Sequence, residues 1–253
     1  MTTPEDAAKY RDRIKALLAK AESTDSPDEA KALSEKAAAL ADKYRVDLAS
    51  LVDDDHPITF GLYTHTLAGT KYLRASLLLL KVVATHYGVV TITPATGNSK
   101  APVLAGTKDD IDLTLMMFGS LVIQRDREVM ATPVPFWAES TVTFRTSFAY
   151  GYAQQIHNRL EALRAAQKAA AESEVREGGA DAAHGSTSLA LFERADQVMA
   201  WATAGMPNVK SGRVHHNAPT LDGGGIRAGQ RAADRADLGQ TRVGANPSAR
   251  AIG

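Results

Sequence analysis

The sequence predicts an α+β protein with an N-terminal helical hairpin, a small, mostly antiparallel sheet with packed helices, a long helix, and a Gly/Arg-rich C-terminal tail. Three observations lead to this prediction. Apolar residues recur at helical spacing over most of the chain, and a β-branched and aromatic alternation appears near residue 60. After Pro207 the composition turns to Gly, Ala, Arg and Asn. We divide the chain into a hairpin at 1–52, an α+β core with the long helix at 56–177, and a short helix with the tail at 187–253.

The N-terminal hairpin is expected from two helices, at about 7–22 and 27–51. Ser26 is placed to cap the second helix, and Pro27 stands at its first position, where no amide hydrogen is needed. Glu29 can reach back to the Ser26 amide, which completes a capping box. Alanine dominates the contact stripe, so the hairpin needs the rest of the protein or a partner against its apolar face.

The middle of the chain follows the order strand, helix, strand, strand, helix after an acidic hinge that ends at Pro57. This order predicts a small α+β layer with a mostly antiparallel sheet. The expected elements are a strand at 58–64, a helix at 73–86, strands at 89–93 and 102–106, and a helix at 109–130. Pro133 and Pro135 end the last of these helices.

A long helix is expected at 139–177, with a buried ridge at steps of four residues. The ridge consists of Phe144, Phe148, Tyr152, Ile156 and Leu160. The half of this helix after residue 164 contains alanine and charged residues, which indicates either an exposed extension or a surface for another chain.

The pairs Gly178-Gly179 and Gly185-Ser186 predict a flexible break between them, and a short helix is expected at 189–203. The chain after residue 207 is too poor in apolar residues to fold alone. We therefore expect residues 210–253 to contribute little to the hydrophobic core.

The composition excludes several function classes. The chain has no cysteine, which excludes disulfides, thiolate catalysis and cysteine-ligated zinc. The longest apolar run, 75–84, contains Lys81 and is shorter than the ~18 residues of a membrane span. The first residues are polar and acidic, unlike an export signal. We expect a cytoplasmic protein without membrane contact.

The charges are unevenly distributed although the net charge is zero. Residues 1–55 hold 9 Lys/Arg and 13 Asp/Glu, a difference of −4, whereas residues 210–253 hold 7 and 3, a difference of +4. The acidic start argues against attraction of the whole protein to nucleic acid, while the tail remains able to contact phosphate. The alternative to phosphate contact is that the acidic residues 1–55 and the basic residues 210–253 attract each other, within one chain or between two copies.

Three acidic residues, Asp109, Asp110 and Asp112, are candidate ligands for a divalent metal in phosphoryl chemistry. They also stand in the first turn of a predicted helix, where the helix dipole stabilises acids. We favour the second interpretation, because no second acidic cluster accompanies them.

Two further candidate sites lie in the tail. His215 and His216, with Asp222 nearby, are possible metal ligands, but no metal-binding motif surrounds them, so a solvated loop is favoured. The glycine run at 221–227 is a weak candidate for a phosphate loop, because it lacks a preceding strand and the GxxxxGK[ST] pattern. No GxSxG motif is present.

The tail also carries Arg227, Arg231 and Arg235 at a spacing of four, which places their guanidinium groups on one side of a helix. A row of small residues follows one position behind, formed by Ala228, Ala232 and Ala236. The arginines are candidates for contact with backbone phosphates or with carboxylates of a protein partner. Packing within the chain and a solvated helix are the alternatives.

Several stretches resemble a known family. Residues 15–21, the acidic proline turn and residues 41–47 resemble the helical hairpin of domain-of-unknown-function family 2786, which is frequent in actinobacterial and phage proteins. Residues 104–112, 145–160 and 227–239 are similar to the region that usually follows this hairpin. The resemblance implies a phage or prophage setting and extends to recombination directionality factors of actinophage serine integrases.

These observations together predict a non-enzymatic accessory protein with no cofactor and no metal. It is expected to act by contact with a protein, such as a DNA-bound recombinase, in a DNA transaction, with DNA contacted through the tail. Regulation of site-specific recombination is the sharpest form of this expectation. The alternatives are a metal-dependent hydrolase or nuclease that uses Asp109, Asp110 and Asp112, and a virion assembly component that docks through the long helix and the tail.

Overall fold

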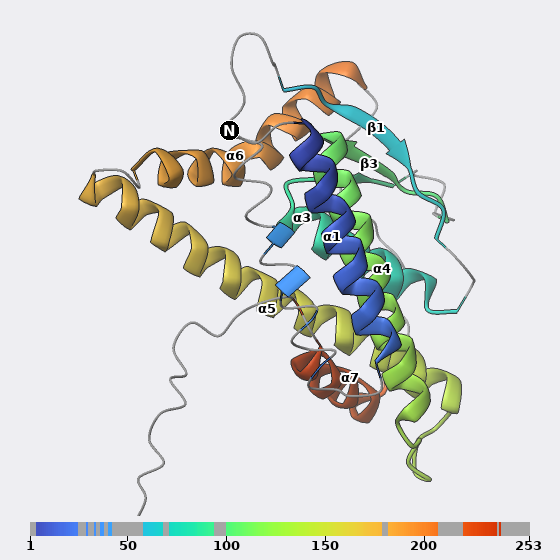
Figure 1. The fold of residues 1–253 in the computed structure, drawn as a ribbon. Helices are drawn as coiled ribbons and strands as arrows, with labels where there is room; N and C mark the ends of the chain where they lie inside the picture. The colour runs from blue at the N-terminus through green and yellow to red at the C-terminus, as the bar shows by residue number, and fades with distance from the viewer. Residues whose placement is uncertain are drawn as a thin grey trace, which may run out of the picture.

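The structure is a computed structural model. It describes residues 4–24, single positions between 29 and 41, and residues 58–67, 71–93, 100–178, 182–206, 220–236 and 238. Within these ranges, the side chains of residues 4–8, 11, 15, 21, 22 and 182–188 are not described. The elements are α1 (Pro4–Ser23), β1 (Gly61–Thr64), α3 (Leu73–His86), β2 (Val90–Ile92), β3 (Val103–Gly106), α4 (Lys108–Ala131), α5 (Thr141–Glu177), α6 (Ala182–Gly205) and α7 (Gly223–Arg235) (Figure 1).

The predicted α+β class is confirmed. The sheet is antiparallel with the order β1-β3-β2, and its register pairs Gly61 with Gly106 and Val90 with Ala105. The three strands lie inside the segments expected at 58–64, 89–93 and 102–106, and each is shorter than expected. A short sheet of this kind needs a helical cover, and α6 supplies it through Val198 and Ala202, which cluster with Ala105 of β3.

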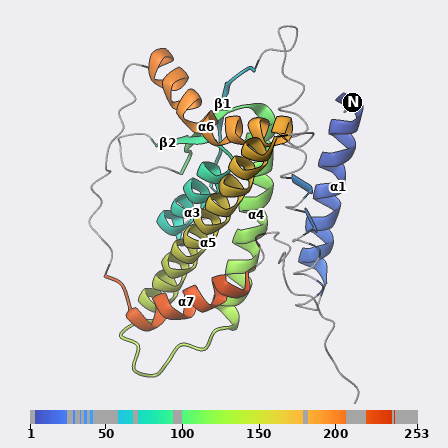
Figure 2. The same ribbon diagram turned by 90° about the vertical axis from the view of Figure 1, so that its left-hand side faces the viewer.

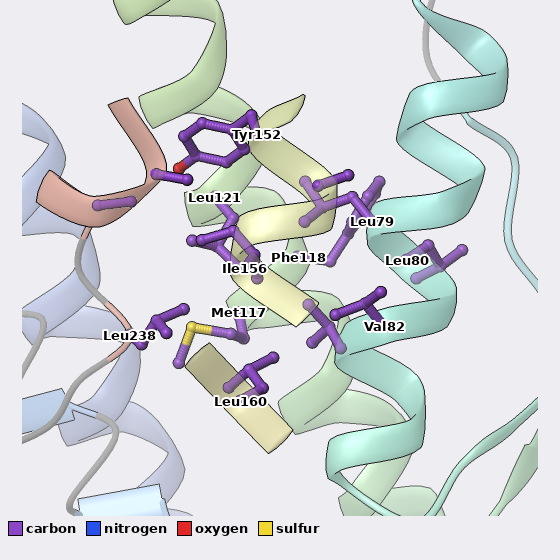
Figure 3. Close-up of a cluster of buried hydrophobic side chains, with 14 of the residues drawn as sticks. Leu79, Leu80, Val82, Met117, Phe118, Leu121, Tyr152, Ile156, Leu160 and Leu238 are labelled. Carbon is purple, nitrogen blue, oxygen red and sulfur yellow. The ribbon is translucent and has the colours of Figure 1, made fainter. Parts of the chain in front are cut away.

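Three helices, α3, α4 and α5, run side by side and form the centre of the molecule, with the sheet and α6 at one end and α7 across the other (Figure 2). The predicted ridge of α5 is confirmed, because all five of its side chains are buried. The core brings together residues of α3, α4, α5 and the tail; Leu79, Leu121, Ile156, Leu160 and Leu238 are among those drawn in Figure 3.

The segment after α5 differs from the expectation. Gly178 follows the last residue of α5 with a positive φ of 71°, which favours glycine and ends the helix. The helix α6 then begins at Ala182 and runs through position 185, so the flexible break expected there is wrong. One glycine inside a helix costs only about 1 kcal/mol relative to alanine, and the alanine- and leucine-rich sequence that follows outweighs it.

The far half of α5 is partly covered rather than fully exposed, because α6 folds back along it. Arg164 Nη2 donates to the carbonyl oxygen of Phe192 at 2.9 Å, and Ala171 is 3% exposed. Lys168, Glu172 and Arg176 remain exposed. The expectation of a simple solvent-exposed extension is therefore wrong for one face of this helix.

The capping box of the hairpin lies mostly outside the described residues, since Ser26 and Pro27 are not among them. Glu29 is described, and its carboxylate accepts from the Thr24 hydroxyl at 2.9 Å and lies 3.4 Å from Lys20 Nζ. The hydrogen bond from Thr24 and the nearby Lys20 ammonium lower the pKa of Glu29. Capping by Ser26 stays a prediction. Among the helices that the structure describes, none has the length and apolar character needed to cross a membrane.

Candidate functional site on helix α7

Helix α7 contacts α5 backbone to backbone. A Cβ atom built at Gly225 would overlap the carbonyl oxygen of Phe144, and one at Gly229 would overlap that of Phe148. From the other side, a Cβ at Gly151 of α5 would overlap the carbonyl oxygen of Ile226. Glycines at these positions let the two helices approach more closely than any side chain allows. The glycine run is therefore a packing element between two helices.

The predicted row of small residues lies in the same contact. Ala228, Ala232 and Ala236 are all less than 9% exposed, and Leu238 beyond the helix is 3% exposed in the main core. The expectation that residues 210–253 contribute little to the core is therefore wrong for the part that the structure describes. The physical reason is that close backbone packing and one leucine replace the large apolar side chains that the composition lacks.

Side chains of α5 and the preceding aspartate hold both ends of α7. At the start, the Asp222 carboxylate accepts from the Gly225 amide at 2.6 Å, and the Asp222 amide donates to Ser147 Oγ at 2.7 Å. At the end, Arg159 Nη1 donates to the carbonyl oxygens of Ala233 and Ala236. These contacts satisfy backbone groups that a helix leaves without partners at its two ends.

This arrangement bears on the phosphate-loop interpretation of residues 221–227. A phosphate would bind the free amides at the start of a helix, but here the Asp222 carboxylate already accepts from one of them. A second anion would meet that negative charge. The geometry of this helix start does not favour phosphate binding.

The outer side of α7 presents the three predicted arginines, all of them exposed. Arg235 Nη2 lies 2.6 Å from Glu128 Oε2 of α4, in an ion pair whose side chains are 63% and 38% exposed. Arg227 and Arg231 have no hydrogen-bond or ion-pair partner among the described residues. Asp234 of the same helix accepts from Gln155 Nε2 at 2.6 Å. We call Arg227, Arg231 and Arg235 the arginine face of α7.

The acidic candidates have structural partners instead of a common centre. Asp110 is 2% exposed and accepts from the Thr107 hydroxyl at 2.8 Å, and its Oδ2 atom lies 3.3 Å from Arg194 Nη1. Asp112 lies 2.9 Å from Lys108 Nζ. The part of the chain that the structure describes holds no group of three or more His, Asp or Glu placed to bind a metal ion. His215 and His216 lie outside that part.

A groove between α3, α5 and the start of α7 was not predicted, because its walls come from three separate segments. It encloses about 480 Å³. Its lining is mostly apolar, with Val82, Ala153 and Ile226 among the wall residues, and it includes the polar side chains of Lys81 and His157. No pattern within a single segment of the sequence marks such a groove.

The comparison with known families bears on the N-terminal part of the chain. Residues 9–48 match the family model described as "Protein of unknown function (DUF2786)". This match supports the resemblance seen in the hairpin and includes most of α1. No curated protein and no solved structure matches the chain.

Proposed function

We propose that this chain is a non-enzymatic accessory protein that acts in a DNA transaction by contact with a protein partner, through the arginine face of α7. The observation that carries the proposal is that Arg227 and Arg231 are exposed and without described partners on a helix fixed by glycine packing. A rigid helix presents its side chains with little loss of conformational freedom on binding. Arginine suits planar, bidentate contact with carboxylates.

A protein partner is favoured over free DNA by the number of available charges. Each phosphate contact contributes about −0.9 to the slope of log affinity against log salt, and proteins that bind DNA well make about 6–10 such contacts. On the arginine face, Arg227 and Arg231 supply two such contacts, and Arg235 is already paired with Glu128. Two contacts support weak binding to free DNA, whereas a DNA-bound protein adds carboxylates and apolar surface.

The finer form of the proposal is regulation of site-specific recombination by contact with a DNA-bound recombinase. It is supported by the similarity of residues 145–160 and 227–239 to the region that accompanies the hairpin in phage and actinobacterial proteins. The family match at residues 9–48 agrees with that setting. The hairpin would then be a second contact element.

Affinity capture with matched variants tests the proposal. Tagged wild-type protein, R227A/R231A, and the control K168A/R176A are used as bait in lysogenic or infected cells, and captured proteins are quantified by mass spectrometry. The control removes two exposed positive charges from the far half of α5. We expect a recombinase or replication protein to be captured by the wild type and the control and lost with R227A/R231A.

Two outcomes contradict the proposal. Capture that does not differ between R227A/R231A and the control would show that the arginine face is not the contact. Capsid or tail proteins among the lost partners would favour virion assembly instead.

The rival hypothesis of a metal-dependent nuclease has its own test. Plasmid DNA is incubated with the protein and Mg²⁺ or Mn²⁺, and D109N/D112N is compared with the wild type, because these two positions are not in the buried pair of Asp110 with Arg194. We expect no cleavage by either protein. Cleavage that the variant loses would overturn the proposal of a binding protein.

A further inference from the structure

The loop between α4 and α5 holds large apolar side chains in water. Phe136 is 95% exposed and Trp137 is 72% exposed, and Met130 and Val142 on the adjoining helix ends are 65% and 73% exposed. The loop projects from the same end of the molecule as α7 (Figures 1 and 2). Folding gains little from these four side chains. We call them the aromatic tip.

The aromatic tip has a defined conformation. The rings of Phe136 and Trp137 pack edge to face with centroids 5.0 Å apart, and the Ala138 amide donates to the Pro135 carbonyl oxygen at 3.0 Å. The Ser140 hydroxyl oxygen accepts from two amides of the first turn of α5. An ordered, exposed aromatic pair loses little conformational entropy when it binds, and tryptophan is enriched among the residues that dominate binding energy at interfaces.

The groove of about 480 Å³ has a lining that is complementary to the aromatic tip, mostly apolar with a few polar atoms. Leu78 and Leu221, two of its lining residues, are 36% and 40% exposed, and Val82 lies between them and the core. Its volume is within the range of about 300–1,000 Å³ typical of sites that enclose a bound group. Gln154 and His157 supply polar atoms that can accept a hydrogen bond from an indole N–H.

One chain cannot join its own tip to its own groove in this fold. The groove residues of α5 begin at Tyr150, nine residues after the helix starts at Thr141. At 1.5 Å per residue this is about 14 Å along the helix. In the structure the tip stays outside the groove of its own chain, since Phe136 is 95% and Trp137 is 72% exposed.

Charge supports a second copy as the occupant of the groove. Glu139 stands two residues after Trp137 and is exposed, and Lys81 is exposed beside the groove. Neither side chain has an ion-pair partner among the described residues. An exposed carboxylate beside the tip and an exposed ammonium beside the groove are complementary charges for a contact between two copies.

We propose that this protein self-associates head to tail, with the aromatic tip of one copy in the groove between α3, α5 and α7 of the next. Each copy then offers one tip and one groove, so the assembly either closes into a ring or grows as a chain. Phe136 and Trp137 bury about 150–250 Å² each at most. The tip is therefore smaller than the roughly 800 Å² per partner of a standard interface, and the association is weak and depends on concentration. The proposal does not rest on the proposed function.

Sedimentation equilibrium or light scattering of the full chain over a wide concentration range tests this proposal. We expect the average mass of the wild type to rise with concentration and that of W137A to stay monomeric. The control V175A changes an exposed apolar residue on the far half of α5 and should behave as the wild type. Circular dichroism checks that each variant is folded.

Charge reversal identifies the contact itself. K81E and E139K should each lower the association constant about tenfold, since each places like charges together. The double variant K81E/E139K restores an opposite pair between copies and should associate nearly as strongly as the wild type.

A mixing experiment separates head-to-tail contact from other arrangements. L78R blocks the groove and keeps the tip, whereas W137A keeps the groove and removes the tip. Each variant alone should be monomeric, and an equal mixture should form a dimer that grows no further.

A wild type that stays monomeric at all concentrations would overturn the proposal, and so would association that W137A retains. If the double variant K81E/E139K does not regain an association constant close to that of the wild type, the contact described here is also contradicted. If the wild type is monomeric but W137A loses a captured protein, the tip serves a different protein and self-association is rejected.

Discussion

Helices α1 and α7 are both poor in large apolar residues, yet they are attached to the central helices in different ways. Helix α1 lies against α4 through a few apolar side chains, among which Ile14 is 2% and Leu18 is 6% exposed. Helix α7 contacts α5 through the backbone, at Gly225, Gly229 and Gly151. One attachment depends on side-chain burial and the other on the absence of side chains.

The difference shows that apolar content alone does not measure how firmly a segment is attached. Close backbone approach gains dispersion contacts along the full length of the crossing, together with weak Cα–H···O contacts. It also brings Arg159, Ser147 and Gln155 of α5 within hydrogen-bond distance of α7. A segment of glycine, alanine and arginine can therefore be an integral part of a core.

The largest expected effect on the free energy of unfolding comes from a substitution that breaks the backbone contact of α7 with α5. Gly229→Ala should lower the free energy of unfolding by about 3 kcal/mol, because the new Cβ overlaps the Phe148 carbonyl oxygen and the helices must separate. Urea denaturation followed by circular dichroism measures the change. A loss no larger than that of an ordinary surface substitution would contradict the close packing of α7 on α5.

The matched control is Gly119→Ala in α4, where a Cβ meets nothing within 4 Å. This substitution should raise the free energy of unfolding by about 0.5–1 kcal/mol, because alanine is the better residue in a helix interior. Opposite signs for the same chemical change at two helical glycines would isolate the backbone contact.

The next effect concerns the side-chain attachment of α1. Leu18→Ala should lower the free energy of unfolding by about 2 kcal/mol, at the low end for a buried leucine because α1 lies on the outside of the bundle. The half-buried neighbour Leu17 is the control, and Leu17→Ala should cost clearly less. Equal losses at the two positions would mean that α1 is not seated on α4 through Leu18.

Much of the fold follows from local sequence patterns. The helix expected at 73–86 is observed at Leu73–His86, since a segment of this length that is apolar almost all round is typical of a helix buried between layers. The strand near 61 follows from the alternation of its residues, and the strands expected at 89–93 and 102–106 are observed at Val90–Ile92 and Val103–Gly106. The ridge from Phe144 to Leu160 is buried as its spacing of four predicts.

The parts that sequence reasoning missed depend on residues far apart in the chain. The buried pair of Asp110 with Arg194 joins positions 84 residues apart, and the first-turn position of Asp110 indicated only a dipole effect. The glycines at 225 and 229 have the spacing of a close helix crossing, whereas we had considered the glycine run at 221–227 only as a weak candidate for a phosphate loop. Proline-rich residues 133–137 indicated the end of a helix, but nothing local indicated that the aromatic rings would remain in water.

A smaller effect tests the capping of α7 by α5. Arg159→Met keeps most of the side-chain volume and removes the guanidinium group that binds the Ala233 and Ala236 carbonyl oxygens. We expect a loss of about 1.5 kcal/mol, the lower end for hydrogen bonds from a charged group, because Arg159 is only partly buried. Arg176→Met on the exposed far half of α5 is the control and should be neutral. A neutral Arg159→Met would show that the last turn of α7 does not need this cap.

The smallest expected effect on stability belongs to the arginine face, and it separates the two sides of α7. R227A/R231A should leave the free energy of unfolding nearly unchanged, because both side chains are exposed, lack described partners, and are replaced by an equally good helix former. Adding Arg235→Ala should cost at most about 1 kcal/mol, the usual upper value for an exposed ion pair such as that with Glu128.

Thermal unfolding and partner capture are measured on the same protein samples, so that lost binding can be compared directly with lost stability. If R227A/R231A loses as much stability as Arg159→Met, the arginine face is part of the packing of α7. Lost capture with unchanged unfolding would instead place the function on the outer side of a helix whose inner side is fixed by glycine.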